Sequence, residues 1–202
     1  MEKIKKAVPF SLVIFRLLLA PVMLIFTLQT HQSGWFLVSC LWAGMISDIF
    51  DGIIARNLGV ATNSLRKWDA NVDIVFWLAA GVCIWLLNGQ LLKDHLGFIA
   101  VLFLLEPVSD CINWVKFKKS GCAHNWLSKT WGVLLLFTFT FLLAGAQPLW
   151  LFRICLVIGL LSQIDRIIIS SMLPGPECDI PSCYHAWLRR KGRPFKRYKL
   201  FN

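Results

Sequence analysis

Apolar residues fill six long runs of this chain, and short polar connections separate the runs. A helix that crosses the hydrocarbon core of a bilayer, which is about 30 Å thick, needs about 20 mostly apolar residues. Each run is close to that length, so each is expected to form one span. The expected spans are residues 8–29, 34–55, 69–88, 96–115, 130–147 and 149–172. The pattern predicts an all-α integral membrane protein with six transmembrane helices.

The composition agrees with this prediction. Of the 202 residues, 57% are hydrophobic and 16% are charged, and a soluble globular domain usually carries more charge than this. The connections between the runs leave no room for a separate soluble domain. We expect one six-helix membrane domain over residues 1–175, followed by a basic cytoplasmic tail over residues 176–202.

The net charge of +10 indicates the topology. Lysine and arginine gather at the N-terminus, in the second connection, in the fourth connection and in the tail, whereas the intervening connections hold only Lys93. By the positive-inside rule both termini are cytoplasmic, and six spans return the chain to the side on which it began. The basic tail is expected to contact anionic lipid headgroups. Nucleic acid is not an expected partner, because no recognition module accompanies the tail.

Four aspartates interrupt the second and third runs, in the pattern Asp48-x-x-Asp51 and then Asp69-x-x-x-Asp73. Residues three or four apart share one face of a helix, so each pair is expected to lie on one face of its span. The two spans run antiparallel, which brings all four carboxylates together near the cytoplasmic ends, at the depth of the lipid phosphates. A carboxylate within a span costs about 2.5–3.5 kcal/mol even on the mildest scale, so compensating cations are expected.

The simplest compensation is a metal site formed by Asp48, Asp51, Asp69 and Asp73. A site with only oxygen ligands favours a hard cation such as Mg²⁺ or Mn²⁺, and two divalent ions would keep all four carboxylates ionised. The next residues on the second span fit an anionic substrate. Gly52 and Ala55 leave the helix face bare for a flat or bulky group, and Arg56 can pair with phosphate.

A structural alternative is that the aspartates pair with arginines inside a helix bundle. The arginines available in or near the spans are Arg16, Arg153 and Arg166. They are too few, because three further acids also need partners. These acids are Glu106, Asp110 and Asp165.

The aspartate pattern resembles the signature of the class I CDP-alcohol phosphotransferases, also called the CDP-alcohol phosphatidyltransferase family. That signature is D-x2-D-G-x2-A-R, a spacer of eight or nine residues, and then G-x3-D-x3-D. Its members found here are Asp48, Asp51, Gly52, Ala55, Arg56, Asp69 and Asp73. Leu65 stands where the signature has its second glycine. The segment from Pro9 to Arg16 also resembles the family's P-N-x-[IL]-T-x-x-R entry into the first span, with Phe10 and Val13 in place of Asn and Thr.

The resemblance implies an enzyme of phospholipid synthesis. Such an enzyme transfers a phosphatidyl group from a CDP-alcohol, here CDP-diacylglycerol, to a small alcohol and releases CMP. It implies two divalent ions, Mg²⁺ or Mn²⁺, held by the four aspartates, with Asp73 as the general base. Asp51, Gly52, Ala55 and Arg56 would contact the CDP moiety. The family also implies a homodimer in the membrane with its active site facing the cytoplasm, in the inner membrane if the source is bacterial.

The sequence leaves the acceptor alcohol and the identity of the CDP-linked donor open. Lys129 and Arg166 are candidates for binding an acceptor phosphate. Alternatively, Glu106, Asp110 and Asp165 meet an amino-alcohol acceptor, or they pair with basic residues as part of the bundle, which is the favoured interpretation.

Two other functions are compatible with the acidic pattern. The first is a divalent-cation transporter, although transporters usually place acidic sites near the midplane and carry internal repeats. The second is a catalytically silent homologue that acts as a membrane scaffold, although the intact aspartates argue against lost catalysis. Release of CMP would indicate the enzyme, ion flux would indicate the transporter, and neither would indicate the scaffold.

Overall fold

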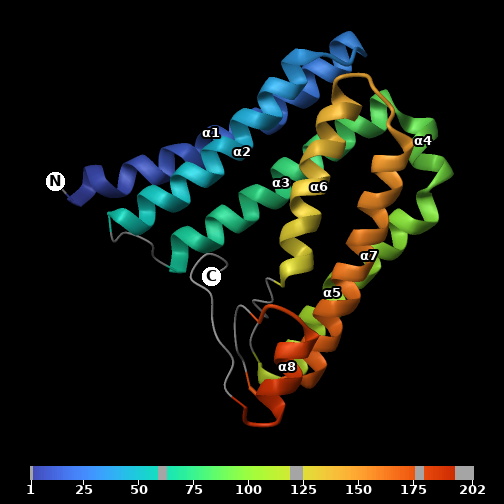
Figure 1. The fold of residues 1–202 in the computed structure, drawn as a ribbon. Helices are drawn as coiled ribbons and strands as arrows, with labels where there is room; N and C mark the ends of the chain where they lie inside the picture. The colour runs from blue at the N-terminus through green and yellow to red at the C-terminus, as the bar shows by residue number, and fades with distance from the viewer. Residues whose placement is uncertain (1, 59–62, 119–124, 176–179, 194–202) are drawn as a thin grey trace. The chain divides into compact units, whose positions relative to one another are not determined.

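The structure, a computed structural model, describes residues 2–58, 63–118, 125–175 and 180–193. Within helices, the side chains of residues 2–9, 55–57, 63–67 and 70 lie outside this description. Every regular element in the described ranges is a helix, which confirms the predicted all-α class (Figure 1). The helices are α1 (Glu2–Thr30), α2 (Trp35–Asn57), α3 (Asn63–Leu87), α4 (Gly89–Asp94), α5 (Leu96–Phe117), α6 (Trp126–Leu143), α7 (Leu149–Met172) and α8 (Cys183–Arg190).

Five of these helices are long and apolar enough to cross a membrane, among the residues that can be described. Their apolar parts are Phe10–Thr30, Trp35–Ile54, Leu96–Phe117, Trp126–Leu143 and Leu149–Met172. The remaining expected span corresponds to α3, whose described apolar part, Asn71–Leu87, is shorter than the other five. The chain is therefore an integral membrane protein, and the span expected over residues 69–88 stays a prediction.

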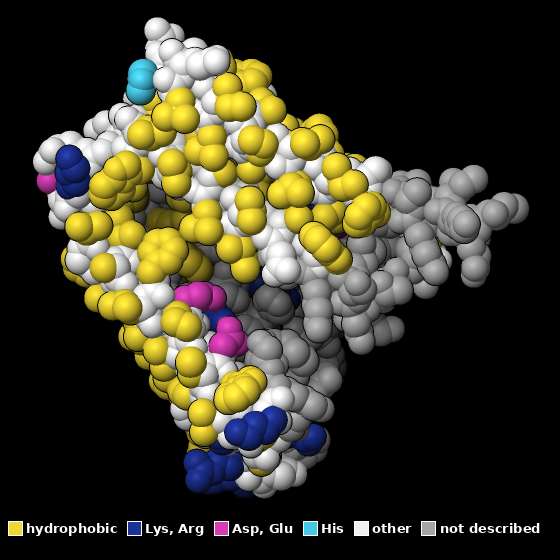
Figure 2. All heavy atoms as spheres, turned by 180° about the vertical axis from the view of Figure 1, so that it is seen from behind, with side chains coloured by type: hydrophobic (Ala, Val, Ile, Leu, Met, Phe, Trp, Pro, Cys, Tyr) yellow, Lys and Arg dark blue, Asp and Glu magenta, His cyan; other side chains and the backbone are white. Residues whose placement is uncertain are grey.

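Large apolar side chains point outward from these helices, as a lipid environment allows. Leu18, Ile25, Phe103 and Leu104 are all more than half exposed. Hydrophobic side chains are spread widely over the described surface on the face shown in Figure 2, where acidic side chains gather near the middle and another lies apart at the edge. A soluble protein would not present so large an apolar surface.

The chain divides into two compact units. The first consists of Met1–Leu91 and Phe139–Gln147, and the second of Leu92–Thr138 and Pro148–Asn202. The expected division into a membrane domain over 1–175 and a tail over 176–202 stays a prediction.

In the first unit, α1 packs against both α2 and α3. Large apolar side chains fill the interior, including Met23, Leu41 and Phe76. The last turns of α6 complete this unit through hydrogen bonds. Trp42 Nε1 donates to Thr140 Oγ1 at 3.0 Å, and Asn88 Nδ2 donates to the carbonyl of Leu142 at 3.1 Å.

In the second unit, α5 packs against α7, and α8 folds back onto α7. The contact with α8 is built on a buried apolar cluster of Ile169, Leu173, Ile180 and Ala186. Lys116 of α5 donates to three carbonyls at the end of α7, at 2.8–3.1 Å, and so satisfies acceptors that a helix C-terminus leaves free.

Candidate active site

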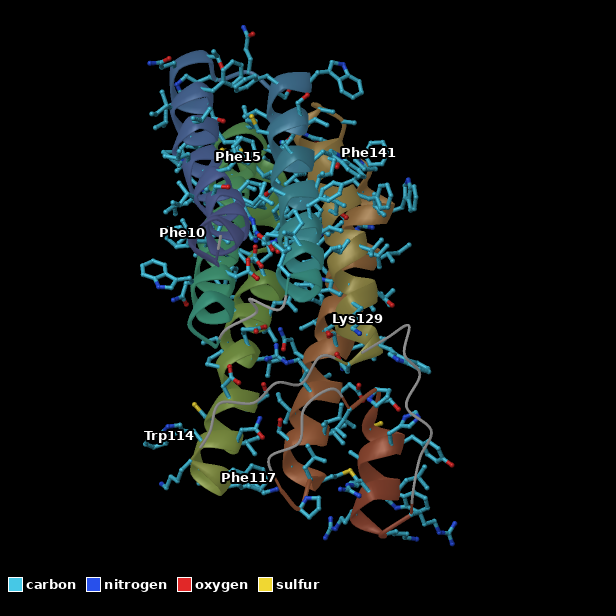
Figure 3. All side chains as sticks on the ribbon, turned by 90° about the vertical axis from the view of Figure 1, so that its left-hand side faces the viewer. Phe10, Phe15, Trp114, Phe117, Lys129 and Phe141 are labelled. Carbon is cyan, nitrogen blue, oxygen red and sulfur yellow. The ribbon has the colours of Figure 1, made fainter. Side chains whose placement is uncertain are left out.

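One arginine from α1 lies at the centre of the four aspartates. Nη1 of Arg16 contacts Asp48 at 2.8 Å and also pairs with Asp73. Nη2 contacts Asp69 at 3.1 Å and also pairs with Asp51. Figure 3 shows nitrogen and oxygen atoms gathered where α1, α2 and α3 approach one another. The predicted convergence of the four carboxylates is therefore present in the structure.

The burial of these groups is uneven. The side chain of Arg16 is 1% exposed and that of Asp51 is 5% exposed, whereas Asp48, Asp69 and Asp73 are each about a third exposed, at 33%, 31% and 33%. Asp51 thus forms the floor of the cluster, and the other three carboxylates form its accessible side. A solute that approaches from outside meets these three first.

Helix geometry explains how the side chains meet. Asp48 and Asp51 are three residues apart on α2, and Asp69 and Asp73 are four apart on α3. Each spacing puts both members on one face of the helix, and α1 packs against both helices. Arg16 occupies the position on α1 from which one guanidinium reaches both pairs.

Three of the carboxylates meet a distance requirement for a metal site. Asp48, Asp51 and Asp69 each offer an oxygen within 4.8 Å of the others. Asp73 contacts the same guanidinium but does not belong to this group of three. Each aspartate uses one oxygen in its contact with Arg16, so the second oxygen is not committed to that contact. An oxygen-only donor set of this kind fits Mg²⁺ or Mn²⁺.

The structural alternative is realised in part, because Arg16 does pair with all four aspartates. One guanidinium carries a single positive charge, however, and leaves the four carboxylates with a net charge of −3. Arg153 and Arg166 belong to the second unit. The electrostatic argument for divalent cations therefore holds with Arg16 in place.

The remaining candidates for binding CDP lie in the last two turns of α2. Gly52 follows Asp51 on α2 and is half-buried. Ala55 and Arg56 lie in the last turn of α2, but their side chains lie outside the described residues, as does that of Leu65.

Both acceptor candidates lie in the second unit, whereas the aspartates lie in the first. Arg166 donates to Glu106 at 2.7 Å and to Gln163 at 3.2 Å, and Gln163 also bonds Glu106. Lys129 is exposed in the first turn of α6 (Figure 3). The favoured interpretation, in which Glu106 pairs with a basic residue of the bundle, matches the contact with Arg166.

The other intramembrane acids behave differently. Asp165 is buried and accepts hydrogen bonds from Asn125 Nδ2 at 2.6 Å and from the backbone N–H of Cys183 at 3.0 Å. Asp110 is half-buried on α5. The sequence did not predict Asn125 as a partner, because an asparagine in a connection carries no distinguishing pattern. The role of Arg16 could have been inferred from its place inside an apolar run.

A sequence model of the CDP-alcohol phosphatidyltransferase family matches residues 6–164. This range is most of the chain and contains Arg16 and all four aspartates. The chain belongs to this family. Members of the CDP-alcohol phosphatidyltransferase family are transferases of substituted phosphate groups and generally depend on divalent metals. No curated protein and no solved structure matches the chain. The match ends just before Asp165, so Arg166 and α8 lie outside the matched range.

Proposed function

We propose that this protein transfers the phosphatidyl group of CDP-diacylglycerol to a small alcohol and releases CMP. The observation that carries the proposal is the convergence of Asp48, Asp51, Asp69 and Asp73 on one point between α2 and α3. Membership of the family supports the reaction class. The donor, the alcohol and the release of CMP are the parts that the experiment below tests.

In the proposed topology α3 crosses the membrane together with the five longer apolar helices, which gives six spans. Both termini then lie in the cytoplasm. The alternating distribution of lysine and arginine supports this orientation. The active site then faces the cytoplasm, in the inner membrane if the source is bacterial. A CDP-linked donor is water-exposed at its nucleotide and lipid-embedded at its acyl chains, so a site near the phosphate depth suits it.

The four aspartates would hold two divalent ions, Mg²⁺ or Mn²⁺. When bound, the ions would neutralise the donor's diphosphate and the charge that develops on the departing CMP. Asp51, the most buried of the four, would contribute from the floor of the site, and Asp48 and Asp69 would contribute from its accessible side. Gly52, Ala55 and Arg56 would contact the CDP moiety together with Asp51.

Asp73 is the proposed general base. It would take the proton of the acceptor hydroxyl as the oxygen bonds to the phosphatidyl phosphorus and the bond from that phosphorus to the CMP oxygen breaks. A carboxylate held firmly by metal is a poor base, and an effective base must reach the hydroxyl. Two observations support this role. Asp73 does not belong to the group of three clustered carboxylates, and its side chain is 33% exposed.

Lys129 and Arg166 are the proposed phosphate-binding residues for an acceptor such as glycerol 3-phosphate. Because Arg166 already pairs with Glu106, an anionic acceptor would have to compete with that carboxylate. A homodimer is the proposed assembly.

The test is acceptor-dependent release of CMP by the full-length protein, reconstituted with CDP-diacylglycerol and Mg²⁺ or Mn²⁺. The acceptors are glycerol 3-phosphate, serine, inositol and inositol phosphate. The variant Asp73→Asn should lose release, whereas Asp94→Asn, on the exposed surface of α4, should retain it. A flux of divalent cations without CMP release would favour a transporter. Folded protein with neither activity would favour a scaffold.

A further inference from the structure

Arg16 joins the two halves of the aspartate cluster with a regular pattern. Nη1 bridges Asp48 of α2 to Asp73 of α3, and Nη2 bridges Asp51 of α2 to Asp69 of α3. Each terminal nitrogen therefore connects one carboxylate of each helix. A single guanidinium has the planar, two-pronged geometry that allows this, whereas the one nitrogen of a lysine could not reach both sides in the same way.

The charge of Arg16 changes the balance of the site in two opposite directions. With all four carboxylates ionised, the cluster together with Arg16 carries −3 without metal and +1 with two divalent ions. Without the guanidinium, the same four carboxylates would carry −4 and then be neutral. The arginine thus makes the empty site less attractive to cations and makes the loaded site more attractive to an anion such as a diphosphate.

The burial of Arg16 keeps this charge in place. The side chain is 1% exposed, and α1 packs against both helices that carry the carboxylates. Its Nε is buried and has no hydrogen-bond partner among the described residues. A buried donor without a partner is costly, so the contacts of the terminal nitrogens must offset that cost to hold the guanidinium in this position.

We propose that Arg16 is a resident cation that opposes the binding of divalent metal and favours the binding of the anionic donor once metal is present. The proposal rests on the proposed function, since it takes the donor to be a CDP compound. In the metal-free protein Arg16 stands in for part of the metal charge and holds α2 and α3 together. In the loaded protein it supplies the excess positive charge that the diphosphate neutralises. Arg16 is a positioning residue in this scheme and takes no part in proton transfer.

The experiment measures two affinities of the purified full-length protein. Binding of Mn²⁺ is followed by electron paramagnetic resonance, and binding of CDP is measured at saturating Mn²⁺. The variants are Arg16→Gln, which removes the charge, and Arg16→Lys, which retains it. The control is Arg153→Gln, which removes an exposed arginine of α7 in the second unit.

The expected result is a pair of opposite shifts in Arg16→Gln. A unit charge within about 5 Å of a divalent ion changes its affinity by about tenfold or more even at the dielectric constant of water. The dissociation constant for Mn²⁺ should therefore fall by about tenfold, and that for CDP should rise by a similar factor. Arg16→Lys should shift both constants much less, and Arg153→Gln should shift neither.

Other outcomes would overturn the proposal. If both affinities weaken together, Arg16 only maintains the shape of the site, and if neither changes, its charge has no role. Should Arg16→Gln unfold without metal, it can be purified with Mn²⁺ and titrated with a chelator. A higher chelator requirement than that of the unmodified protein supports the proposal, and a lower one contradicts it. Failure to fold even with Mn²⁺ would also contradict it, because the loaded variant site is neutral.

The two proposals fail separately. An unmodified protein that binds Mn²⁺ but no CDP compound would overturn the proposed function. The shift in Mn²⁺ affinity between the unmodified protein and Arg16→Gln would still report whether Arg16 opposes metal binding.

Discussion

Gly44 of α2 lies directly against the ring of Phe76 of α3. A Cβ atom on Gly44 would come within 2.7 Å of Cε2 and 2.8 Å of Cε1 of that ring, which is closer than carbon atoms pack. Gly44 precedes Asp48 by one helical turn, and Phe76 follows Asp73 by about one turn. The contact therefore sets how closely the two helices approach beside the four carboxylates.

Enlarging Gly44 should push the aspartate pairs apart. Phe76 is 1% exposed and cannot move into free space, so Gly44→Val is expected to cost about 2 kcal/mol of stability, within the range for overpacked cores. The melting temperature and CMP release should both fall. Gly81→Val on α3 is the matched control, because nothing lies within 4 Å of a Cβ there. Equal effects of the two substitutions would contradict this account.

The four aspartates should separate into two classes when replaced one at a time by asparagine. Asp48→Asn, Asp51→Asn and Asp69→Asn each remove a member of the clustered group, so each should reduce the stabilisation that Mn²⁺ gives to the folded protein, as measured by the shift in melting temperature. Asp73→Asn should retain more of that shift than the other three while losing CMP release by about 100-fold or more, the range for a lost general base. If Asp73→Asn abolishes the Mn²⁺ shift, the assignment of Asp73 as the loosely held base is wrong.

The pair of Glu106 and Arg166 permits a test that separates structure from acceptor binding. If the pair only stabilises the bundle, Arg166→Gln leaves Glu106 without its cation and should lower stability by about 1–3 kcal/mol, and the double variant Glu106→Gln/Arg166→Gln should recover much of the loss. If Arg166 binds an anionic acceptor, the double variant should instead keep a raised KM for that acceptor. Steady-state kinetics and thermal melting of the three variants distinguish these results.

Asp165 should control the docking of α8 and the reactivity of Cys183. Burial, followed by the hydrogen bond and the charge of Asp165, raises the pKa of the Cys183 thiol, so this thiol stays protonated at neutral pH and its alkylation rate should increase as the pH rises. Asp165→Asn removes the charge, which lowers the pKa, and weakens the acceptor for the N–H of Cys183. Alkylation at pH 7, located by peptide mass spectrometry, should therefore be faster in Asp165→Asn. An unchanged rate would mean that Asp165 does not tie down α8.

Much of this architecture could be predicted from particular residues. The runs of apolar residues placed all of the long helices, and five of them are long and apolar enough to span a bilayer. The spacings of Asp48 with Asp51 and of Asp69 with Asp73 predicted the shared faces and their convergence. These features follow from helical periodicity, which acts over a few residues and can be read locally.

The contacts that the sequence did not predict link residues far apart in the chain. Arg16 is separated from Asp48 by 32 residues and from Asp73 by 57, and Asn125 is separated from Asp165 by 40. Periodicity sets which face of a helix a side chain occupies, but the rotation of one helix against another decides which faces meet. The sequence offers Arg16 as one of several arginine partners, and only packing shows that it reaches all four carboxylates.

The wide separation of Arg16 from its partners has a consequence for the biogenesis of the protein. Ribosomes add about 5–20 residues per second, so Asp73, which lies 57 residues after Arg16, is synthesised about 3–11 seconds later. During that interval only Asp48 and Asp51 of the second helix can pair with Arg16. Once the third helix arrives, all four partners become available, and the first three helices can assemble before translation of the remaining chain is complete. A polypeptide that stalls before the second helix would leave this arginine unpaired and would be a ready substrate for membrane quality control.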